Sequence, residues 1–350
     1  MLSVGLVGLP NAGKSTLFNL LTKRSIPAEN FPFCTIDPHD GIVEVKDSRL
    51  EELSKISNSD KIIPAAIEFR DIAGLVKGAH AGAGLGNQFL SHIREVDMIL
   101  MIIRTFEHDS IIHVENRVNP NEDFEILMLE LTLADLKMVE SAIIRIRKEI
   151  SKDKFGQQKI EVLEQIQQAL TDIKPANTVI LDENKVDKEV IKWRTTLNLL
   201  TDKPILKLAN IITDGTNLDF DSDFNLDIGL ESELDGSSAE ERVEFGLDPI
   251  AGLDQIIKQC FKTLKLETYL TTGKVETRAW TYTKGSQASV CAGKIHTDFE
   301  KKFIKGEVIK FEDYIKFNGR KGALENGKLQ LVGKDYIMLD GDVVEFVIGT

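Results

Sequence analysis

Residues 8–16 read Gly8-Leu9-Pro10-Asn11-Ala12-Gly13-Lys14-Ser15-Thr16, and this stretch decides the fold. Its pattern, G-x-x-x-x-G-K-S, is typical of the phosphate-binding P-loop. The apolar run Ser3–Val7 predicts a strand before it, and the apolar residues within 17–21 predict a helix after it. In such a strand–loop–helix unit, backbone N–H groups converge on phosphate oxygens at the helix N-terminus. The sequence therefore predicts a binding site for a nucleoside triphosphate.

The residues at the end of this loop have distinct expected roles at the phosphates. Gly13 lets the backbone approach the ligand, Lys14 reaches the outer phosphates, and the Ser15 hydroxyl can hold Mg²⁺. Mg²⁺ is therefore the first predicted cofactor. The residues expected to contact the nucleotide here are Asn11, Ala12, Gly13, Lys14, Ser15 and Thr16.

A second motif indicates a nucleotide-dependent switch. An apolar strand pattern ends in Asp71-x-x-Gly74, which is typical of GTPase-type proteins. In these proteins the aspartate lies near the Mg²⁺ ion and the glycine N–H can sense the γ-phosphate. Between the two motifs, the loop 30–36 carries one threonine, Thr35, placed to close over the metal. We expect Ser15 and Thr35 to be direct Mg²⁺ ligands and Asp71 to be an indirect one.

Three stretches carry the pattern of a known family: Asn-Phe-Pro-Phe-Cys-Thr-Ile at 30–36, Asp-Ile-Ala-Gly-Leu-Val-Lys-Gly-Ala at 71–79, and Ile-His-Thr-Asp-Phe-Glu-Lys at 295–301. Together they resemble the YchF subfamily of Obg-like P-loop NTPases, and the resemblance extends over nearly all 350 residues. It implies a nucleotide-binding domain, a helical coiled-coil insertion and a C-terminal TGS domain of β-grasp shape. It also implies a preference for ATP and an association with ribosomes.

The order of the predicted elements indicates an α/β fold. Apolar runs that predict strands alternate with predicted helices, which is the pattern of a mostly parallel sheet with helices on its faces. This is the arrangement expected of a P-loop NTPase domain. The runs are Ser3–Val7, 41–45, 65–70, Met98–Arg104 and Ile205–Asn210.

The apolar period changes to that of helices between the last two of these strands. Residues 122–150 and 157–170 each carry an apolar face, and the short connection between them predicts an antiparallel helical arm. Residues 187–200 are predicted to be helical as well. Near the C-terminus, short strands with turn signals, such as 336–338 and 343–346, predict a small β-rich module.

These changes of pattern, together with the family resemblance, predict three parts of the chain. The nucleotide-binding domain comprises residues 1–121 and 201–266, and the helical arm is inserted into it as residues 122–200. The C-terminal β-grasp (TGS) domain comprises residues 267–350.

Composition narrows the class of protein. The formal net charge of −13 argues against general electrostatic adhesion to DNA or other nucleic acid. The sequence has no apolar run long enough to span a membrane and no room for a signal peptide before the first strand. Its three cysteines are too few and too scattered for a disulfide framework or a zinc site. We therefore predict a cytoplasmic protein with no membrane partner.

The charge is distributed unevenly along the chain. Residues 267–350 contain 13 Lys and Arg against 12 Asp and Glu, so this part is near +1 and the remainder carries about −14. Residues 219–244 form an acidic stretch. A ribosomal partner is therefore expected to meet the C-terminal part, or a local basic face, rather than the acidic stretch.

The base-reading segment departs from guanine-specific proteins. Such proteins have Asn-Lys-x-Asp, whose aspartate accepts hydrogen bonds from N1–H and the 2-amino group of guanine. Here the segment is Asn210-Ile211-Ile212-Thr213. A neutral threonine removes a charge-assisted acceptor worth about 2–3 kcal/mol of guanine preference. We expect Asn210 and Ile211 to lie at the base and ATP to be preferred over GTP, with relaxed selectivity as the alternative.

The hydrolytic residues also differ from the common pattern. Many GTPases place a glutamine directly after the Asp-x-x-Gly glycine to orient the attacking water, and this chain has Leu75 there. In related potassium-dependent NTPases an asparagine at the position of Asn11 helps to hold a monovalent cation, so K⁺ is a second candidate cofactor. The family resemblance points to His113 as the catalytic loop residue, with His108 and His80 as alternatives. Slow hydrolysis without such a residue is a further alternative.

The sequence thus predicts a Mg²⁺-dependent ATPase that acts as a slow switch and associates with ribosomes. One alternative is a GTPase of the same fold. Another is a nucleotide-dependent binding protein whose output is complex formation, with incidental hydrolysis.

Overall fold

The computed structural model describes residues 2–23, 40–72, 85–108, 111, 113, 117–244, 248 and 252–349, with the backbone alone for residues 85–88. Four residues of the predicted site and its switch region lie outside the described residues, namely Thr35, Gly74, Leu75 and His80. The chain divides into two units. The first comprises Met1–Gly41 and Glu68–Gly252, and the second comprises Ile42–Ile67 and Leu253–Thr350.

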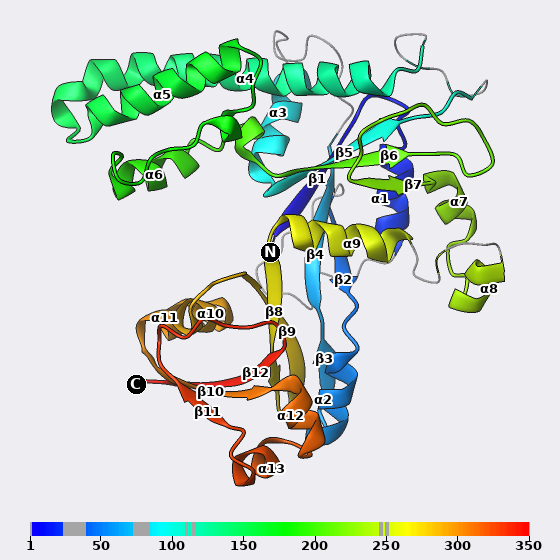
Figure 1. The fold of residues 1–350 in the computed structure, drawn as a ribbon, viewed down its shortest axis with the longest axis vertical. Helices are drawn as coiled ribbons and strands as arrows, with labels where there is room; N and C mark the ends of the chain where they lie inside the picture. The colour runs from blue at the N-terminus through cyan, green and yellow to red at the C-terminus, as the bar shows by residue number, and fades with distance from the viewer. Residues whose placement is uncertain are drawn as a thin grey trace. The chain divides into compact units, whose positions relative to one another are not determined.

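The first unit is built on a six-stranded sheet with the order β2-β4-β1-β5-β6-β7, of which β2 and β4 continue into the second unit (Figure 1). From β4 to β7, each strand runs parallel to its neighbour. Every residue of β1 and β5 is buried, as expected for central strands covered on both faces. The predicted α/β class with a mostly parallel sheet is therefore confirmed. The strands are β1 (Ser3–Val7), β2 (Asp40–Val45), β4 (Ala65–Asp71), β5 (Met98–Arg104), β6 (Ile205–Asn210) and β7 (Phe224–Leu226).

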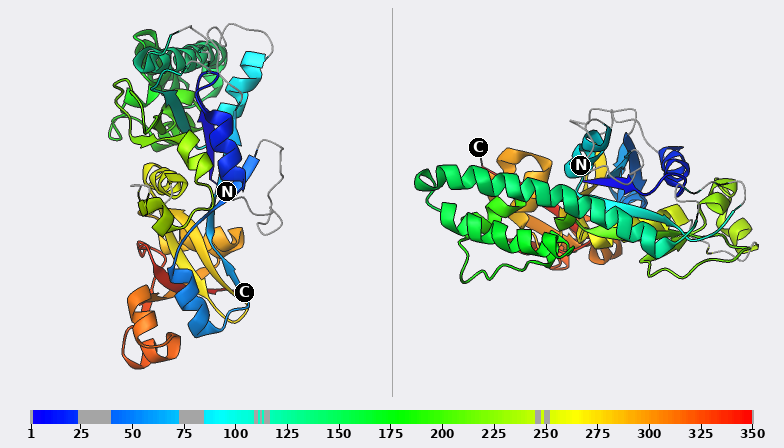
Figure 2. Two further views of the ribbon diagram at one scale, coloured as in Figure 1. Left: turned by 90° about the vertical axis from the view of Figure 1, so that its right-hand side faces the viewer. Right: turned by 90° about the horizontal axis from the view of Figure 1, so that it is seen from above.

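The predicted helical arm is formed by two long helices, α4 and α5, which lie side by side (Figures 1 and 2). Asn119 caps α4 by accepting a hydrogen bond from the backbone N–H of Glu122, and Pro120 occupies its first turn. The two helices share an apolar core made by Val139, Ala142, Ile143 and Ile146 of α4 and by Ile160, Leu163, Ile166 and Leu170 of α5. The described helices of this unit are α1 (Lys14–Lys23), α3 (Leu85–Glu95), α4 (Pro120–Glu149), α5 (Gly156–Thr171), α6 (Lys188–Thr195), α7 (Ile228–Glu233) and α8 (Ala239–Glu244), with 3₁₀ turns η2 (Ile150–Lys152), η3 (Ala176–Thr178) and η4 (Leu200–Asp202).

The second unit has a six-stranded sheet with the order β11-β10-β12-β8-β9-β3. The β8–β9 hairpin is antiparallel, and β12 pairs in parallel with β8 at the centre and antiparallel with β10. This is a β-grasp topology, as predicted. The strands are β3 (Lys61–Ile63), β8 (Leu266–Thr272), β9 (Glu276–Thr283), β10 (Phe303–Lys310), β11 (Gln330–Val332) and β12 (Asp342–Ile348). The described helices are α2 (Arg49–Ser57), α9 (Gly252–Thr263), α10 (Ala288–Ile295), α11 (Thr297–Lys301), α12 (Phe311–Lys316) and α13 (Arg320–Glu325).

Three details of the second unit differ from the sequence-based expectation. Residues 42–67 belong to this unit, because Leu50 and Leu53 of α2 are buried in one core with residues of β8 and β12. Residues 253–266, which were expected in the nucleotide-binding domain, belong to it as well. The predicted strand 336–338 is wrong, since Ile337 forms only an isolated bridge with Gln287. Across the part of the chain that the structure describes, no helix has the length and apolar character needed to cross a bilayer.

Candidate nucleotide-binding site

The P-loop joins the carboxyl end of β1 to the N-terminus of α1, as predicted. Asn11 and Gly13 have positive φ angles of 63° and 105°. A Cβ atom at Gly8 would lie 2.5 Å from the carbonyl oxygen of Ile102, so the close approach of these two backbones requires glycine. The first-turn N–H groups of the ten-residue α1 have no acceptor within the helix, which makes this end a site for phosphate oxygens.

Lys14 is the buried cation of the site. The residue is 7% exposed, and its Nζ donates a hydrogen bond to the carbonyl oxygen of Leu9 at 2.8 Å. Burial lowers the pKa of Lys14 to about 8, whereas the Asp71 carboxylate acts to raise it. A bound triphosphate adds negative charge beside the ammonium group and would raise this pKa, because opposite charges favour each other's ionised forms.

Oxygen ligands that suit a metal ion lie beside the P-loop. Asp71 ends β4 and is in register with Leu6 of β1, the strand that leads into the loop. Ser15 and Thr16 are exposed in the first turn of α1. A hydroxyl and a carboxylate at this edge are the donor types that Mg²⁺ takes together with nucleotide phosphates. The residues present therefore fit Mg²⁺.

A cavity of about 610 Å³ opens beside the P-loop, within the size range of small-molecule sites. The loop after β6 forms one wall, the start of α7 forms another, and Phe106 and Ile111 contribute apolar surface. His108, an alternative catalytic histidine in the sequence analysis, lines this cavity too. The cavity is thus placed to receive the base of a nucleotide whose phosphates bind the P-loop.

Asn210 shapes this cavity from a buried position. Its Nδ2 donates to the carbonyl oxygen of Ala12 in the P-loop at 3.0 Å, and its Oδ1 accepts from the N–H of Ile228 in α7 at 3.3 Å. Both ends of the amide therefore hold backbone segments together. Ile211 follows at the cavity wall, as the sequence predicts for a base contact.

Thr213 occupies the position of the guanine-reading carboxylate, and its backbone N–H donates to Asp227 Oδ2 at 2.7 Å. Asp227 caps α7 by accepting from the N–H of Leu230 at 2.9 Å. The Asp227 carboxylate thus accepts hydrogen bonds from two backbone N–H groups, those of Thr213 and Leu230.

His113 lies next to the P-loop in a buried position. The residue is 7% exposed, and its Nε2 lies 2.8 Å from Oδ2 of Asp123 in the first turn of α4. A narrow space lined by His113, Asp123, Arg104 and P-loop residues 9–12 is too small to admit a water molecule. The structure therefore brings the predicted catalytic histidine to the P-loop, with a carboxylate as its partner.

Asp123 and Asp227 were not predicted as site residues. The Asn119-Pro120 pair is typical of a helix start, so the position of Asp123 in the first turn of a helix could have been predicted from the sequence. The position of Asp227 is harder to predict, because the strand before it, β7, has only three residues and its pattern is too short to recognise.

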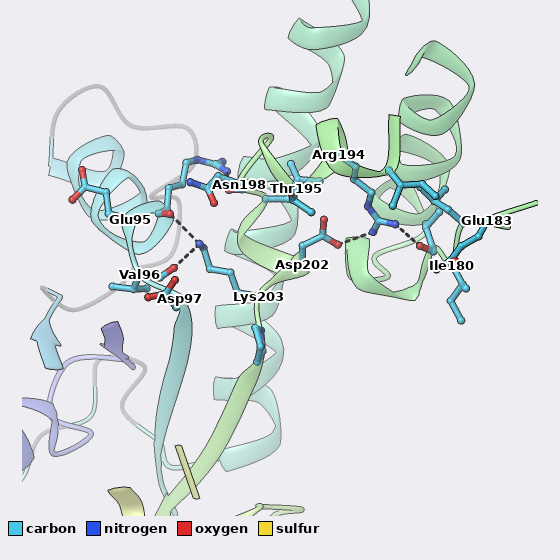
Figure 3. A pocket seen from close by; sticks show the side chains of 16 residues that line it. Glu95, Val96, Asp97, Ile180, Glu183, Arg194, Thr195, Asn198, Asp202 and Lys203 are labelled. Carbon is cyan, nitrogen blue, oxygen red and sulfur yellow. Dashed lines mark hydrogen bonds and ion pairs between the residues drawn. The ribbon is translucent and has the colours of Figure 1, made fainter. Parts of the chain in front are cut away.

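Another cavity, of about 580 Å³, lies at the opposite edge of the sheet, before β5 and β6 (Figure 3). Its cations are engaged by other groups of the protein. Lys203 donates to the carbonyl oxygens of Arg94 at 2.9 Å and Val96 at 2.6 Å. Arg194 pairs with Asp202 at 2.7 Å. Lys14 also has a carbonyl partner, but it lies at a helix N-terminus whose N–H groups can bind phosphate, so the P-loop edge is the better site for phosphates.

Comparisons with known proteins agree with this architecture. Residues 3–133 match the family model MMR_HSR1, described as a 50S ribosome-binding GTPase. Residues 266–348 match the model YchF-GTPase_C, described as a protein of unknown function. The solved structure of the Schizosaccharomyces pombe YchF GTPase is similar with a TM-score of 0.79 and 32% sequence identity, covering 99% of this chain and 97% of that one.

Curated relatives are similar over nearly their whole length. The Ribosome-binding ATPase YchF of Bacillus subtilis (strain 168) is 44% identical, over 99% of this chain and 98% of the relative. The protein of the same name from Escherichia coli O157:H7 is 44% identical, over 98% of both chains. With a P-loop domain, an inserted helical arm and a β-grasp unit matched over nearly its full length, this chain belongs to the YchF family of P-loop NTPases.

Proposed function

We propose that this chain is a Mg²⁺-dependent ATPase that acts as a slow molecular switch and associates with ribosomes. The observation that supports the nucleotide choice is the cavity beside the P-loop, whose reading segment has Thr213 in place of a carboxylate. The ribosomal partner is inferred from the relatives named ribosome-binding ATPases. Such a partner would place the protein in the cytoplasm.

In this proposal the triphosphate is held by residues 11–16, where Lys14 contributes the cation. Mg²⁺, when bound, would offset the charge that develops during phosphoryl transfer. Ser15 and Thr35 would hold it directly, and Asp71 would act on it indirectly. Asn11 is exposed in the P-loop, where it would help to hold K⁺ beside the phosphates.

Gly74 would sense the γ-phosphate through its N–H.

Adenine would lie in the cavity beside Ile211. The apolar walls of this cavity suit either purine, so the choice between ATP and GTP depends on polar groups at the edge of the base. Without a carboxylate at 213, guanine loses the acceptor that pairs with N1–H and the 2-amino group. ATP is therefore the favoured substrate.

Restoring the guanine-reading residues is expected to shift this choice. The double variant Ile211→Lys/Thr213→Asp should move the ratio of GTP to ATP affinity toward GTP by roughly 30-fold, since a charge-assisted hydrogen bond is worth about 2 kcal/mol. The matched control, Ile211→Lys/Thr213→Asn, has the same shape without the charge and should shift the ratio less. Equal ratios in both variants, measured by equilibrium titration, would contradict this reading of position 213.

Nucleotide affinity is expected to depend on pH through Lys14. Its pKa is lowered to about 8, so the charged form predominates below that pH and the neutral form above it. If only the charged form binds phosphate, affinity should fall about tenfold between about pH 7 and about pH 9. The control is Lys14→Arg, whose guanidinium does not titrate in this range and whose residual affinity should stay flat. A flat profile in the unmodified chain would show that Lys14 does not titrate there.

The three-part organisation completes the proposal. The helical arm and the TGS domain would couple the nucleotide state to the ribosome, and the near-neutral charge of residues 267–350 favours contact there over the acidic stretch 219–244. The proposed parts are residues 1–41, 68–121 and 201–252 for the nucleotide and 122–200 for the arm, while residues 42–67 and 253–266 join the TGS domain of residues 267–350 in the second unit.

Sedimentation with ribosomes tests the proposed switch. The purified chain is mixed with ribosomes in the presence of ATP, a non-hydrolysable ATP analogue or ADP. A switch should co-sediment differently with the analogue and with ADP, and binding with ATP should decay as ATP is hydrolysed. Equal binding with ATP and the analogue would favour a binding protein with incidental hydrolysis, and no binding in any state would remove the ribosomal partner.

A further inference from the structure

Positive charge is concentrated at the end of the helical arm. This arm tip, residues 144–155, comprises the C-terminal end of α4, the turn η2 and the loop into α5. It contains five Lys and Arg against two Asp and Glu, so its formal charge is +3 while the other residues of the chain carry −16. A local excess of cations on an acidic protein gives a polyanion a place to approach. The cations of the arm tip are Arg145, Arg147, Lys148, Lys152 and Lys154.

Most of these cations are not neutralised by the arm itself. Arg147 pairs across the arm with Glu164 of α5 at 2.7 Å, and the Asp153 carboxylate pairs with Lys159 at 2.7 Å. Both contacts lie within the arm and leave the other cations of the tip exposed to solvent. Four exposed cations of the arm tip form no ion pair within the described residues, namely Arg145, Lys148, Lys152 and Lys154.

Stabilisation of the helix explains only part of this charge. Arg147 and Lys148 lie in the last turn of α4, where cations interact favourably with the helix dipole. This interaction falls off beyond the last turn. Arg145 lies before that turn, and Lys152 and Lys154 follow the end of the helix. Three of the four cations without an ion pair therefore need another explanation.

The second helix of the arm lacks this charge. Lys159 is the single Lys or Arg of α5, and it is engaged by Asp153. The exposed positions of α5 are occupied by glutamine, glutamate and threonine, namely Gln157, Glu161, Glu164, Gln165, Gln168 and Thr171. The cations are therefore confined to α4 and the turn that follows it.

The spacing of the cations suits a row of phosphates. Arg145 and Lys148 are three residues apart on α4, so they are neighbours on the helix surface. At about 1.5 Å per residue, the segment from Arg145 to Lys152 extends over roughly 10 Å. A double-stranded nucleic acid carries one phosphate charge per roughly 2 Å of its axis, so each cation can meet a different phosphate.

Apolar side chains contribute little to the surface of the arm tip. Ile144 and Ile150 are 58% and 37% exposed. Phe155 is half-buried, and Nζ of Lys154 lies 4.9 Å from the centre of its ring. Two exposed isoleucines present far less apolar surface than the face of a membrane-binding helix. The arm tip therefore suits a hydrated polyanion better than a lipid surface.

The arm tip lies far from the nucleotide site along one continuous helix. α4 has 30 residues, which corresponds to about 45 Å, and it ends beside the start of α5 (Figures 1 and 2). Asp123 in its first turn lies next to P-loop residues 9–12. A partner bound at the arm tip would thus leave the nucleotide site accessible.

We propose that the arm tip binds the phosphate backbone of ribosomal RNA through its four cations without an ion pair, Arg145, Lys148, Lys152 and Lys154. This inference rests on the proposed association with ribosomes and names the surface and the chemistry of the contact. Phosphate contacts of this kind position a protein without reading base sequence. The negative charge of the remaining chain opposes other orientations on RNA and so favours contact through the tip.

Removal of the four cations tests the proposal. The variant Arg145→Gln/Lys148→Gln/Lys152→Gln/Lys154→Gln is compared with the unmodified chain for binding to purified ribosomes and to a fluorescent RNA duplex. Four phosphate contacts predict that affinity falls roughly 100-fold between about 50 and about 200 mM salt. We expect the variant to bind both probes at least tenfold more weakly at about 50 mM salt and to lose most of this salt dependence.

The matched control removes four exposed lysines from another part of the arm and so changes the net charge equally. It is Lys174→Gln/Lys185→Gln/Lys188→Gln/Lys192→Gln. We expect this variant to bind both probes as the unmodified chain does, and an equal loss in both variants would overturn the proposal. The double variant Lys152→Glu/Lys154→Glu lies outside α4 and repeats the test with the helix unchanged. Melting temperature and ATP affinity are measured for every variant, and ATP affinity should change by less than about twofold.

The outcomes separate this inference from the proposed function. If the unmodified chain and the arm-tip variant bind ribosomes equally well, the inference is overturned and the ribosomal association stands. If the unmodified chain binds ribosomes in no nucleotide state, the proposed function fails and the inference fails with it. Polyglutamate is the competing probe, and binding to it as tight as to the RNA duplex would overturn RNA as the partner in favour of an acidic protein surface.

Discussion

Lys14→Ala is expected to abolish Mg²⁺-dependent triphosphate binding, with a loss of affinity of roughly 100-fold or more. The buried ammonium is the cation of the P-loop, and its hydrogen bond to the Leu9 carbonyl at 2.8 Å holds it within the loop. Alanine removes both the charge and the donor. The measurement is equilibrium titration with a fluorescent triphosphate in the presence and absence of Mg²⁺.

The fold should survive this substitution, because the cost of burying the lysine charge disappears along with its hydrogen bond. Ser15→Ala should also remove the Mg²⁺ dependence of binding, since we propose its exposed hydroxyl as the metal ligand from α1. Lys23→Ala is the matched control, because Lys23 lies at the far end of α1 with a side chain that is 60% exposed. Near-normal binding in both site variants would show that the triphosphate binds elsewhere.

His113→Ala is expected to lower ATP turnover about tenfold or more, with little change in ATP affinity. Leu75 follows the Asp-x-x-Gly glycine and has no group that can orient water, so another residue must do so. The imidazole of His113 lies beside P-loop residues 9–12, so we propose it for this role. Turnover is measured at saturating ATP with K⁺ present.

His108→Ala is the matched control for this variant, since His108 belongs to the loop after the same strand but is exposed and lines the base cavity. Leu75→Ala should also matter less to turnover. Full activity in the His113 variant would reject its catalytic role. Asn11 with a bound K⁺ would then be the better explanation of hydrolysis without glutamine.

The P-loop and the central strands could be predicted from sequence because their signals are local. A glycine required by close backbone approach, as at Gly8, appears directly in the motif. The buried strands β1 and β5 appear as continuous apolar runs for the same reason. The arm helices were predicted to within a few residues, because their apolar faces repeat with the helical period.

Features that depend on distant residues could not be predicted in the same way. The pairing of His113 with Asp123 joins a loop to a helix, and the tie between Asn210 and Ala12 joins residues far apart in the chain. Residues 42–67 enter the second unit through the packing of α2, which no local pattern reveals. The apolar segment 336–338 resembles a strand but lacks a neighbouring strand that extends the pairing beyond Ile337.

The central claim is that the cavity beside the P-loop prefers adenine, because Thr213 stands where guanine-specific proteins have a carboxylate. Equilibrium titration of the purified chain with labelled ATP and GTP, in Mg²⁺ and K⁺, tests it most directly. The account predicts that ATP binds at least as tightly as GTP. A dissociation constant for GTP about ten times lower than that for ATP, or about 1.4 kcal/mol in favour of GTP, would contradict it.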